Sequence, residues 1–218
     1  MIYIGLALKG LYMSEKSTTS QLIEACLTRL AAGDNTAWDE LITHAYNRLL
    51  ALCRTTVYKE LSKPNPLITP NAVLAEAYKK LATAMKNPKV QPKNAEEFLG
   101  LAARNIRWQL LDMIRQLTPP PVDARFFDAH PDGRGLSEVL EKREMAVKEQ
   151  ERWRLLNETL DALPEHEREI FDLHWTQGLS EYEIAERLGK TRNEVDGIWR
   201  KVKRKIGAAL KDYALPKT

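Results

Sequence analysis

The sequence predicts an all-α protein in which two small helical domains are joined by a linker that contains proline and glycine. Three observations lead to this prediction. Apolar residues recur every three or four positions along most of the chain, which is the spacing of helices with one buried face. Residues that favour helix starts precede several of these segments. Near the middle of the chain, the run from Pro119 to Pro121 cannot continue a helix and indicates a domain boundary.

The composition allows real hydrophobic cores and says little about binding partners. The 218 residues are 44% hydrophobic and 29% charged, with a formal net charge of +3. The two cysteines, Cys26 and Cys53, lie on apolar faces of predicted helices, and we interpret them as buried thiols in a reducing cytosol. The apolar opening of the chain is too short to span a bilayer and lacks the pattern of a signal peptide. We therefore expect a cytoplasmic protein without membrane insertion.

Four helices are predicted in the first domain, which spans residues 18–118 after a loose tail of residues 1–17. They run from Thr19 to Ala32, from about Thr36 to the break at LSKPNPLITP, from Pro70 to Met85, and from Ala95 to Leu117. Thr69 is expected to cap the third helix, with Pro70 in its first turn, because proline has no N–H group that the helix must satisfy. Asn94 and Glu97 are expected to cap the fourth helix.

The fourth helix is predicted to have one buried face and a second face with aromatic and basic side chains. The buried stripe consists of Leu99, Ala102, Ile106, Leu110, Met113 and Leu117. Arg104, Trp108 and Arg115 lie together on the far side, with Leu111 near them. An indole between guanidinium groups is a platform on which an unstacked base can lie while the cations hold phosphate. The alternative is that Trp108 packs against another helix and the arginines are solvated, and the sequence leaves this choice open.

The second domain is predicted over residues 137–218, after a linker of residues 119–136. It begins with a charged helix from Ser137 to about Ala162 and a helix from Glu165 to Thr176. The stretch LSEYEIAERLGKTRNEVDGIWRKVKRKIGAAL then predicts two helices with a tight turn at Gly189. A capping box is predicted at the start of each, from Ser180 with Glu183 and from Thr191 with Glu194. This pattern is typical of a helix-turn-helix.

The last helix is predicted to pack through one face and to present a cationic face to solvent. The apolar face consists of Val195, Ile198, Trp199, Val202, Ile206 and Ala209, and the opposite face of Asn193, Arg200, Arg204 and Lys211. Acidic residues outnumber basic ones from Leu155 to Lys190, and this balance reverses after Thr191. The reversal favours a helix that contacts nucleic-acid phosphates, whereas the plainer interpretation is a solvated basic helix.

No catalytic signature is present in the sequence. It contains no P-loop, HExxH or GxSxG motif. The four histidines, His44, His130, His166 and His174, are scattered along the chain, without the helical spacing of a metal site. We therefore expect no enzymatic activity, no cofactor and no bound metal.

The C-terminal helices resemble a known family. The run DALPEHEREIFDLHWTQGLSEYEIAERLGKTRNEV is similar to the promoter-reading C-terminal domain of the sigma-70 superfamily, especially that of extracytoplasmic-function (ECF) sigma factors. Leu163-Pro164 and Gly178-Leu179-Ser180 make the resemblance specific, because a generic helix-turn-helix lacks them. A looser similarity, in the order and at the distance found in that family, links PNAVLAEAYKKLATA and FLGLAARNIRWQLLDMIRQ to the core-binding and promoter-melting portion of ECF sigma factors.

The resemblance implies a sigma factor that binds the RNA polymerase core and promoter DNA. The minus-thirty-five duplex would contact Thr191, Arg192, Asn193, Asp196, Gly197, Arg200, Lys203 and Arg204. The melted minus-ten strand would contact Lys89, Lys93, Asn94, Arg104, Arg107, Trp108 and Arg115. The coiled coil of the polymerase beta-prime subunit would contact Asn71, Leu74, Ala75 and Tyr78.

Two rival interpretations stand beside the sigma factor. A helix-turn-helix regulator would bind duplex DNA without core polymerase, and a helical adaptor would bind protein only. An anti-sigma factor in another chain also stays open as a partner. Asp196 departs from the basic or neutral residue usual in the family, so its carboxylate would either accept a hydrogen bond from cytosine or repel phosphate.

Overall fold

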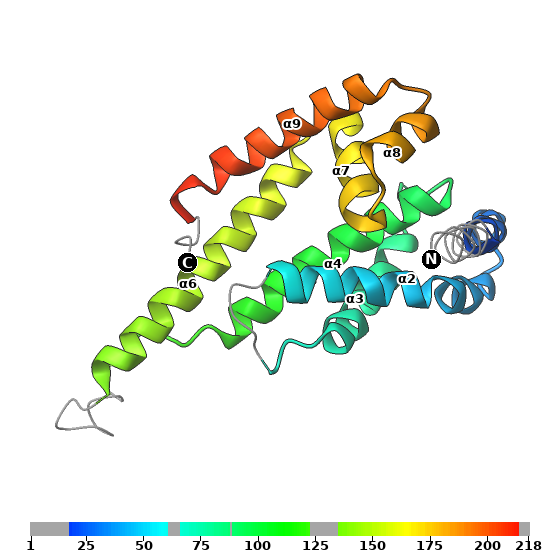
Figure 1. Cartoon of the computed structure of the whole chain (residues 1–218). Coiled ribbons are helices and arrows are strands. Elements are labelled where there is room, and N and C mark those ends of the chain that lie inside the picture. The colour runs from blue at the N-terminus through cyan, green and yellow to red at the C-terminus, as the bar shows by residue number, and fades with distance from the viewer. Residues whose placement is uncertain (1–17, 61–65, 88, 123–134, 214–218) are drawn as a thin grey trace, which may run out of the picture.

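The computed structural model describes residues 18–60, 66–87, 89–122 and 135–213, which form helices and their connections and confirm the all-α prediction (Figure 1). Residues 18–31 are helical, and the later elements are α2 (Ala37–Glu60), α3 (Pro70–Met85), α4 (Ala95–Leu117), α6 (Leu136–Asp161), α7 (Glu165–Gln177), α8 (Glu181–Leu188), α9 (Arg192–Ala209) and η1 (Lys211–Tyr213). The predicted tail of residues 1–17 and most of the predicted linker lie outside the described residues. Among the described residues, no helix has the length and apolarity to cross a membrane, and no cluster of ligand side chains is placed to hold a metal.

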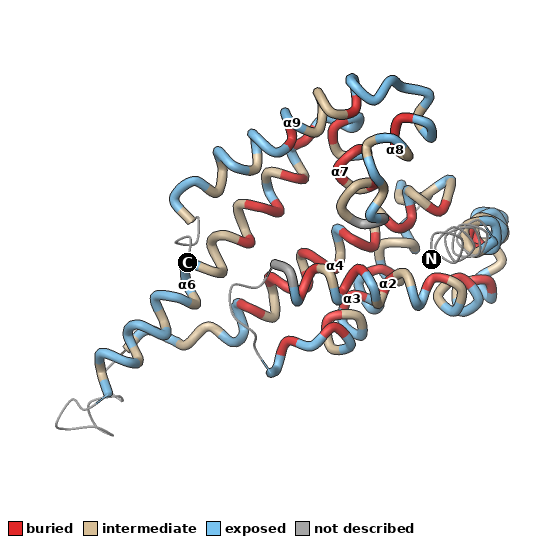
Figure 2. Tube along the Cα trace, viewed as in Figure 1, coloured by how far each residue is buried: buried red, intermediate tan, exposed pale blue. Residues whose placement is uncertain are grey.

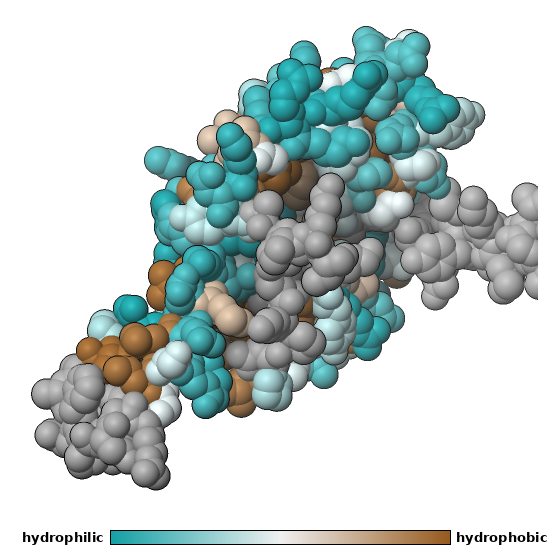
Figure 3. All heavy atoms as spheres, turned by 60° about the vertical axis from the view of Figure 1, so that its left-hand side comes forward, coloured by the Kyte–Doolittle hydropathy of each residue, from teal (hydrophilic) through white to brown (hydrophobic). Residues whose placement is uncertain are grey.

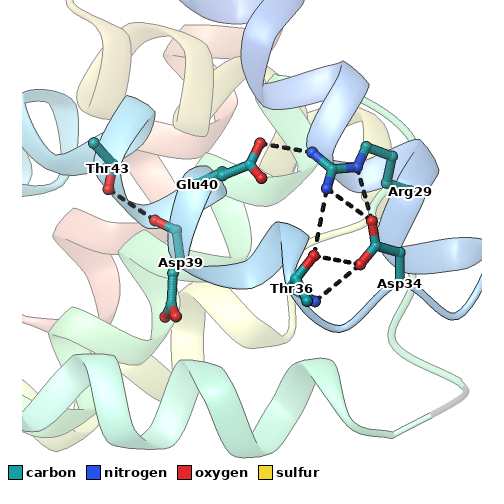
Figure 4. Close-up of polar contacts among 6 residues, drawn as sticks. All are labelled: Arg29, Asp34, Thr36, Asp39, Glu40 and Thr43. Carbon is teal, nitrogen blue, oxygen red and sulfur yellow. Dashed lines mark hydrogen bonds and ion pairs between the residues drawn. The ribbon is translucent and has the colours of Figure 1, made fainter.

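A polar cluster closes the turn between helical residues 18–31 and α2 (Figure 4). Arg29 donates to Asp34 from Nε at 2.9 Å and to Glu40 from Nη1 at 2.6 Å. Asp34 also accepts from the backbone N–H of Thr36 at 3.0 Å, and hydrogen bonds from Thr36 and Arg29 lower the pKa of this carboxyl. Gly33 lies in the turn between Arg29 and Asp34 with a φ of 91°, a conformation that favours glycine. These contacts hold the first helix pair at its connection.

α3 and α4 begin at the predicted capping residues. The hydroxyl of Thr69 accepts from the backbone N–H of Ala72 at 3.2 Å, and Pro70 is the first residue of α3. The Asn94 side chain accepts from the backbone N–H of Glu97 at 2.8 Å at the start of α4. Both contacts satisfy N–H groups that have no acceptor inside the helix. Because these signals are local, the sequence alone locates both helix starts.

α4 is the central helix, because other helices pack on two of its sides (Figures 1 and 2). α2 and α3 pack on one side, and the predicted stripe is buried there at Leu99, Ala102, Ile106 and Leu110. α6 and α7 pack on the other side, and a second set of residues is buried, Ala103, Arg107, Leu111 and Ile114. Three details of the prediction were therefore wrong. Met113 of the predicted stripe is only half-buried. Leu111 is fully buried rather than beside an exposed face, and Leu117, at the free end of the helix, is 36% exposed.

The main hydrophobic cluster extends through both predicted domains. It joins residues of α2, α3 and α4 to Trp153, Leu156 and Leu160 of α6, Phe171 of α7 and Val202 of α9. A smaller cluster holds the helix-turn-helix together and consists of Ile170, Leu173, Ile184, Ala185 and Val195. The described helices therefore form two groups that are in direct contact along α4.

α6 is longer than the part of it that packs. Its second half lies in the core, whereas its first half projects from the body of the molecule (Figure 1). Along the projecting half, Leu140, Met145 and Val147 are between 41% and 46% exposed. Figure 3 shows apolar surface near the projecting end. Ion pairs one turn apart, such as that of Lys142 with Glu138, support this part of the helix.

Both cysteines are buried free thiols. Burial raises the pKa of the Cys53 thiol from its ordinary value of 9.0 to about 12, and burial also raises the pKa of Cys26. The reactive thiolate of Cys53 is then about a thousandfold rarer in the folded protein than in the unfolded chain. We expect neither cysteine to react with a thiol reagent at mildly alkaline pH until the protein unfolds. Titration with a chromogenic disulfide, with and without denaturant, measures this, and rapid reaction in the native protein would contradict it.

Candidate nucleic-acid interface

Two capping boxes build the helix-turn-helix from α8 and α9. At the start of α8, the N–H of Ser180 donates to the Glu183 carboxylate at 2.8 Å, and the N–H of Glu183 donates to the Ser180 hydroxyl at 3.3 Å. Thr191 and Glu194 make the same two contacts at the start of α9, at 2.7 and 3.3 Å. Between the helices, Gly189 turns the chain with a φ of 61°, which a side chain would strain. The predicted motif is therefore confirmed.

α9 packs through its apolar face, which is partly buried, and exposes its cationic face, as its periodicity predicts. Val195 and Val202 are fully buried, and the ring of Trp199 packs against His174 with 4.3 Å between ring centres. Of the predicted duplex residues, those exposed are Thr191, Arg192, Asn193, Arg200, Lys203 and Arg204, and those half-buried are Asp196 and Gly197. The upper part of the molecule, where α9 lies in Figure 1, is mainly hydrophilic in Figure 3. We call the exposed residues Arg200, Lys203 and Arg204 the cationic strip.

Two ion pairs change the charge that α9 presents. Asp196 accepts from Arg200 at 2.6 Å, one helical turn away. A surface pair of this kind contributes little to stability, but it partly neutralises the guanidinium and restricts its position. Lys205 pairs with Glu167 of α7 at 2.6 Å and is therefore directed toward protein. Asp196 thus has a partner within α9 before any base is bound, which the sequence analysis did not foresee.

The residues that the resemblance assigns to the melted strand do not form one exposed patch. Along the chain they are Lys89, Lys93, Asn94, Arg104, Arg107, Trp108 and Arg115. The first three precede or cap α4, and Arg115 is exposed near its end, 3.6 Å from Asp112. Arg104, Arg107 and Trp108 lie at the middle of α4, where α6 and α7 pack. Of these three, only Arg104 remains exposed.

Asp161, at the end of α6, is a partner that the sequence analysis missed. Its Oδ2 accepts from Nη2 of Arg104 at 2.8 Å and from Nε1 of Trp108 at 3.1 Å. Trp108 therefore packs toward another helix, as the alternative interpretation held, whereas Arg104 is paired rather than simply solvated. Because Asp161 is far from α4 in the sequence, no spacing rule connects them.

Arg107 of α4 is buried against α7, with 5% of its surface exposed. Its Nη1 is 4.0 Å from Oδ1 of Asp172, and its guanidinium carbon is 5.6 Å from the ring centre of Phe171. Burial lowers the pKa of Arg107 and raises the pKa of Asp172, and the attraction between the two charges opposes both shifts. Among the described residues, Nε and Nη1 of Arg107 have no hydrogen-bond partner. A buried guanidinium with incomplete hydrogen bonding costs free energy.

An apolar cavity of about 380 Å³ lies between α2, α3 and α4. Its lining includes all four residues assigned to the polymerase, Asn71, Leu74, Ala75 and Tyr78, together with Ile42 and Tyr46 of α2. Trp38 donates from Nε1 to the hydroxyl of Tyr78 at 3.0 Å and fixes one edge of the cavity. Tyr46 is 47% exposed on α2, and the sequence analysis did not assign it to this site. A large aromatic side chain on the exposed part of a helix is the signal that could have indicated the α2 side of the cavity.

A family comparison identifies the C-terminal region. Residues 153–197 match the family model described as Sigma-70, region 4. The match shows that these helices are similar to region 4 of sigma-70 proteins. It covers the end of α6, all of α7 and α8, and the first turns of α9, and it supports a DNA-binding helix-turn-helix in this region. No curated protein matches the chain significantly.

Proposed function

We propose that this chain is an ECF-type sigma factor that directs core RNA polymerase to promoters. In this role α9 contacts the minus-thirty-five duplex, α4 with the loop before it captures the melted minus-ten strand, and α3 docks on the beta-prime coiled coil. The mechanism uses binding energy without covalent chemistry. Phosphate contacts position α9, and polar side chains near its N-terminal end read base edges in the major groove.

The observation that carries this proposal is the cationic strip on a helix that begins within the region 4 match. Arg200 and Arg204 are exposed one turn apart, while Val195 and Val202 anchor the same helix in the core. A helix held in this way can enter the major groove without losing its packing. The capping boxes at both helix starts support the same role, because they stabilise the first turn of each helix of the motif.

The cavity between α2, α3 and α4 supports the polymerase contact. It is lined mainly by apolar side chains, and the exposed rings of Tyr46 and Tyr78 lie along it. A partner helix that lays an apolar face into such a groove buries surface on both molecules. All four residues assigned to polymerase by resemblance belong to α3 and line this cavity.

Retention of core polymerase by the purified protein tests the proposal. A sigma factor should retain the core subunits in stoichiometric amounts and support run-off transcription, from which the start sites and promoter sequence can be mapped. A helix-turn-helix regulator would bind duplex DNA and retain no polymerase. A protein-only adaptor would show no promoter binding with polymerase present. Failure to retain core polymerase would reject the proposed function.

Replacing Arg200 and Arg204 together with alanine should reduce the salt dependence of promoter binding. If both side chains contact phosphate, the slope of log K against log salt becomes shallower by about two, because each neutralised phosphate releases about one counterion. A salt titration of promoter binding with polymerase present measures the slope. The matched control replaces Lys142 and Lys148 of α6, which pair within their own helix, and should leave the slope unchanged. An unchanged slope in the arginine variant would remove both residues from the interface.

A further inference from the structure

Part of the face of α4 that we assign to the melted strand is covered by the C-terminal half of the same chain. Arg104 and Trp108 both donate to one oxygen, Oδ2 of Asp161. Two N–H groups that converge on one anionic oxygen can equally bind a phosphate oxygen of a nucleic-acid backbone. Asp161 therefore satisfies the same two donors that a phosphate oxygen would satisfy.

We propose that this contact is autoinhibitory. In the free protein α6 and α7 close over α4, with Asp161 in place of a DNA phosphate, and they must leave α4 before a single strand binds. This inference rests on the proposed strand-binding role of α4. Only open molecules bind the strand, so the apparent affinity for the strand falls in proportion as the open fraction becomes smaller. A partner that prefers the open arrangement raises this affinity.

Arg107 shows that the closed arrangement blocks the middle of this face. It lies between Arg104 and Trp108 in sequence, yet it is buried beneath α7, near Phe171 and Asp172. A strand cannot reach its guanidinium without separation of α4 from α7. Separation also returns to solvent the Nε and Nη1 groups, which lack hydrogen-bond partners among the described residues. The hydration of these groups offsets part of the favourable packing free energy that is lost when α4 separates from α7.

The seam between the two halves combines polar contacts with incomplete packing. The Asn157 amide donates to the backbone carbonyl of Arg107 at 3.3 Å, and Arg187 of α8 pairs with Glu96 of α4. A cavity of about 150 Å³ remains among α2, α4, α6, α7 and α9. Unfilled space forfeits dispersion contacts, so this seam is held less tightly than a fully packed core. These features lower the free-energy cost of separating the halves, although the buried side chains of α6 also pack in the seam.

Replacing Asp161 with asparagine tests the contact, because asparagine keeps the size of the side chain and removes its charge. We expect the full chain to bind a single-stranded oligodeoxynucleotide about fivefold more tightly, the effect of losing one partly exposed charge-assisted contact. Fluorescence anisotropy of a labelled strand measures the dissociation constant. The matched control is Glu158→Gln, which removes the same charge one turn earlier on α6, where it pairs with Arg154. Equal strand affinity of Asp161→Asn and the control would overturn the proposal.

A covalent closure gives a second test that does not depend on weakening the contact. The double variant Glu96→Cys with Arg187→Cys replaces the surface ion pair between α4 and α8 by two thiols, while Cys26 and Cys53 stay buried. A short bismaleimide joins the two thiols, and N-ethylmaleimide caps them without joining them. We expect the joined protein to bind the strand at least about tenfold more weakly than the capped protein, because its open fraction is removed.

The two modified proteins also separate this inference from the proposed function. Both should bind duplex promoter DNA equally, because they carry the same two substitutions and the cationic strip of α9 is exposed in the closed arrangement. Equal strand affinity of the joined and capped proteins would overturn the closed arrangement and leave the sigma-factor proposal standing. If neither form, nor Asp161→Asn, binds the strand, then α4 is not the strand site and the inference falls with that part of the proposed function.

Discussion

Trp153→Ala should lower the free energy of unfolding by about 3–5 kcal/mol, the usual cost of removing a fully buried aromatic side chain. Trp153 is 1% exposed and lies in the cluster that joins α6 to α4. Its Nε1 also donates to the Glu149 carboxylate at 3.0 Å, so truncation removes both packing and a hydrogen bond. Because a cavity already lies beside Trp153, the removed ring would enlarge an existing void. Chemical denaturation followed by circular dichroism measures the change.

The matched control for this prediction is Tyr182→Ala on α8. Tyr182 is 68% exposed, so its removal should change the free energy of unfolding by less than about 0.5 kcal/mol. A loss for Trp153→Ala as small as that of the control would contradict the packing of α6 against the first half of the chain. Such a result would also argue against the closed arrangement, because the same cluster lies between the two halves.

Ala75→Glu should weaken binding to core polymerase by at least about tenfold, because a carboxylate placed in an apolar contact loses its hydration without gaining a partner. Ala75 is exposed on α3 and lines the cavity between α2, α3 and α4. Glutamate is a good helix former, so α3 itself should remain intact. Titration of labelled protein with core polymerase measures the affinity.

Ala51→Glu on α2 is the control for the polymerase contact. Ala51 is also exposed on a helix of the first half, but it is not part of the cavity lining, so the same change of charge should leave polymerase binding unaffected. If Ala75→Glu binds core polymerase as tightly as the unaltered protein does, the cavity is not the docking site. If both variants lose affinity equally, general electrostatic repulsion explains the loss.

Local signals in the sequence predicted the helices and their starts. Thr69, Asn94, Ser180 and Thr191 each accept a hydrogen bond from a backbone N–H three positions later, as the capping patterns predict. The two faces of α9 follow from helical periodicity in the same way. Such signals succeed because the atoms that satisfy one another are separated by less than a turn or two of helix. The match to Sigma-70, region 4 supports the resemblance that these C-terminal helices show.

The second side of α4 shows where sequence reasoning stopped. Its pattern of Arg104, Trp108 and Arg115 is compatible with an exposed base-stacking face and equally with a covered one. Periodicity reports which residues share a side of a helix, but not whether another element packs on that side. The structure places α6 and α7 there, so Trp108 is half-buried and Leu111 is fully buried.

The sequence by itself therefore determined the helix boundaries, the helix-turn-helix and the outward cationic strip, because each depends on neighbouring residues. Only the tertiary structure decided that Asp161 meets Arg104 and Trp108, and that Arg107 is buried beside Asp172. These contacts join helices that are far apart in the chain, and their formation depends on how whole helices pack rather than on any local spacing.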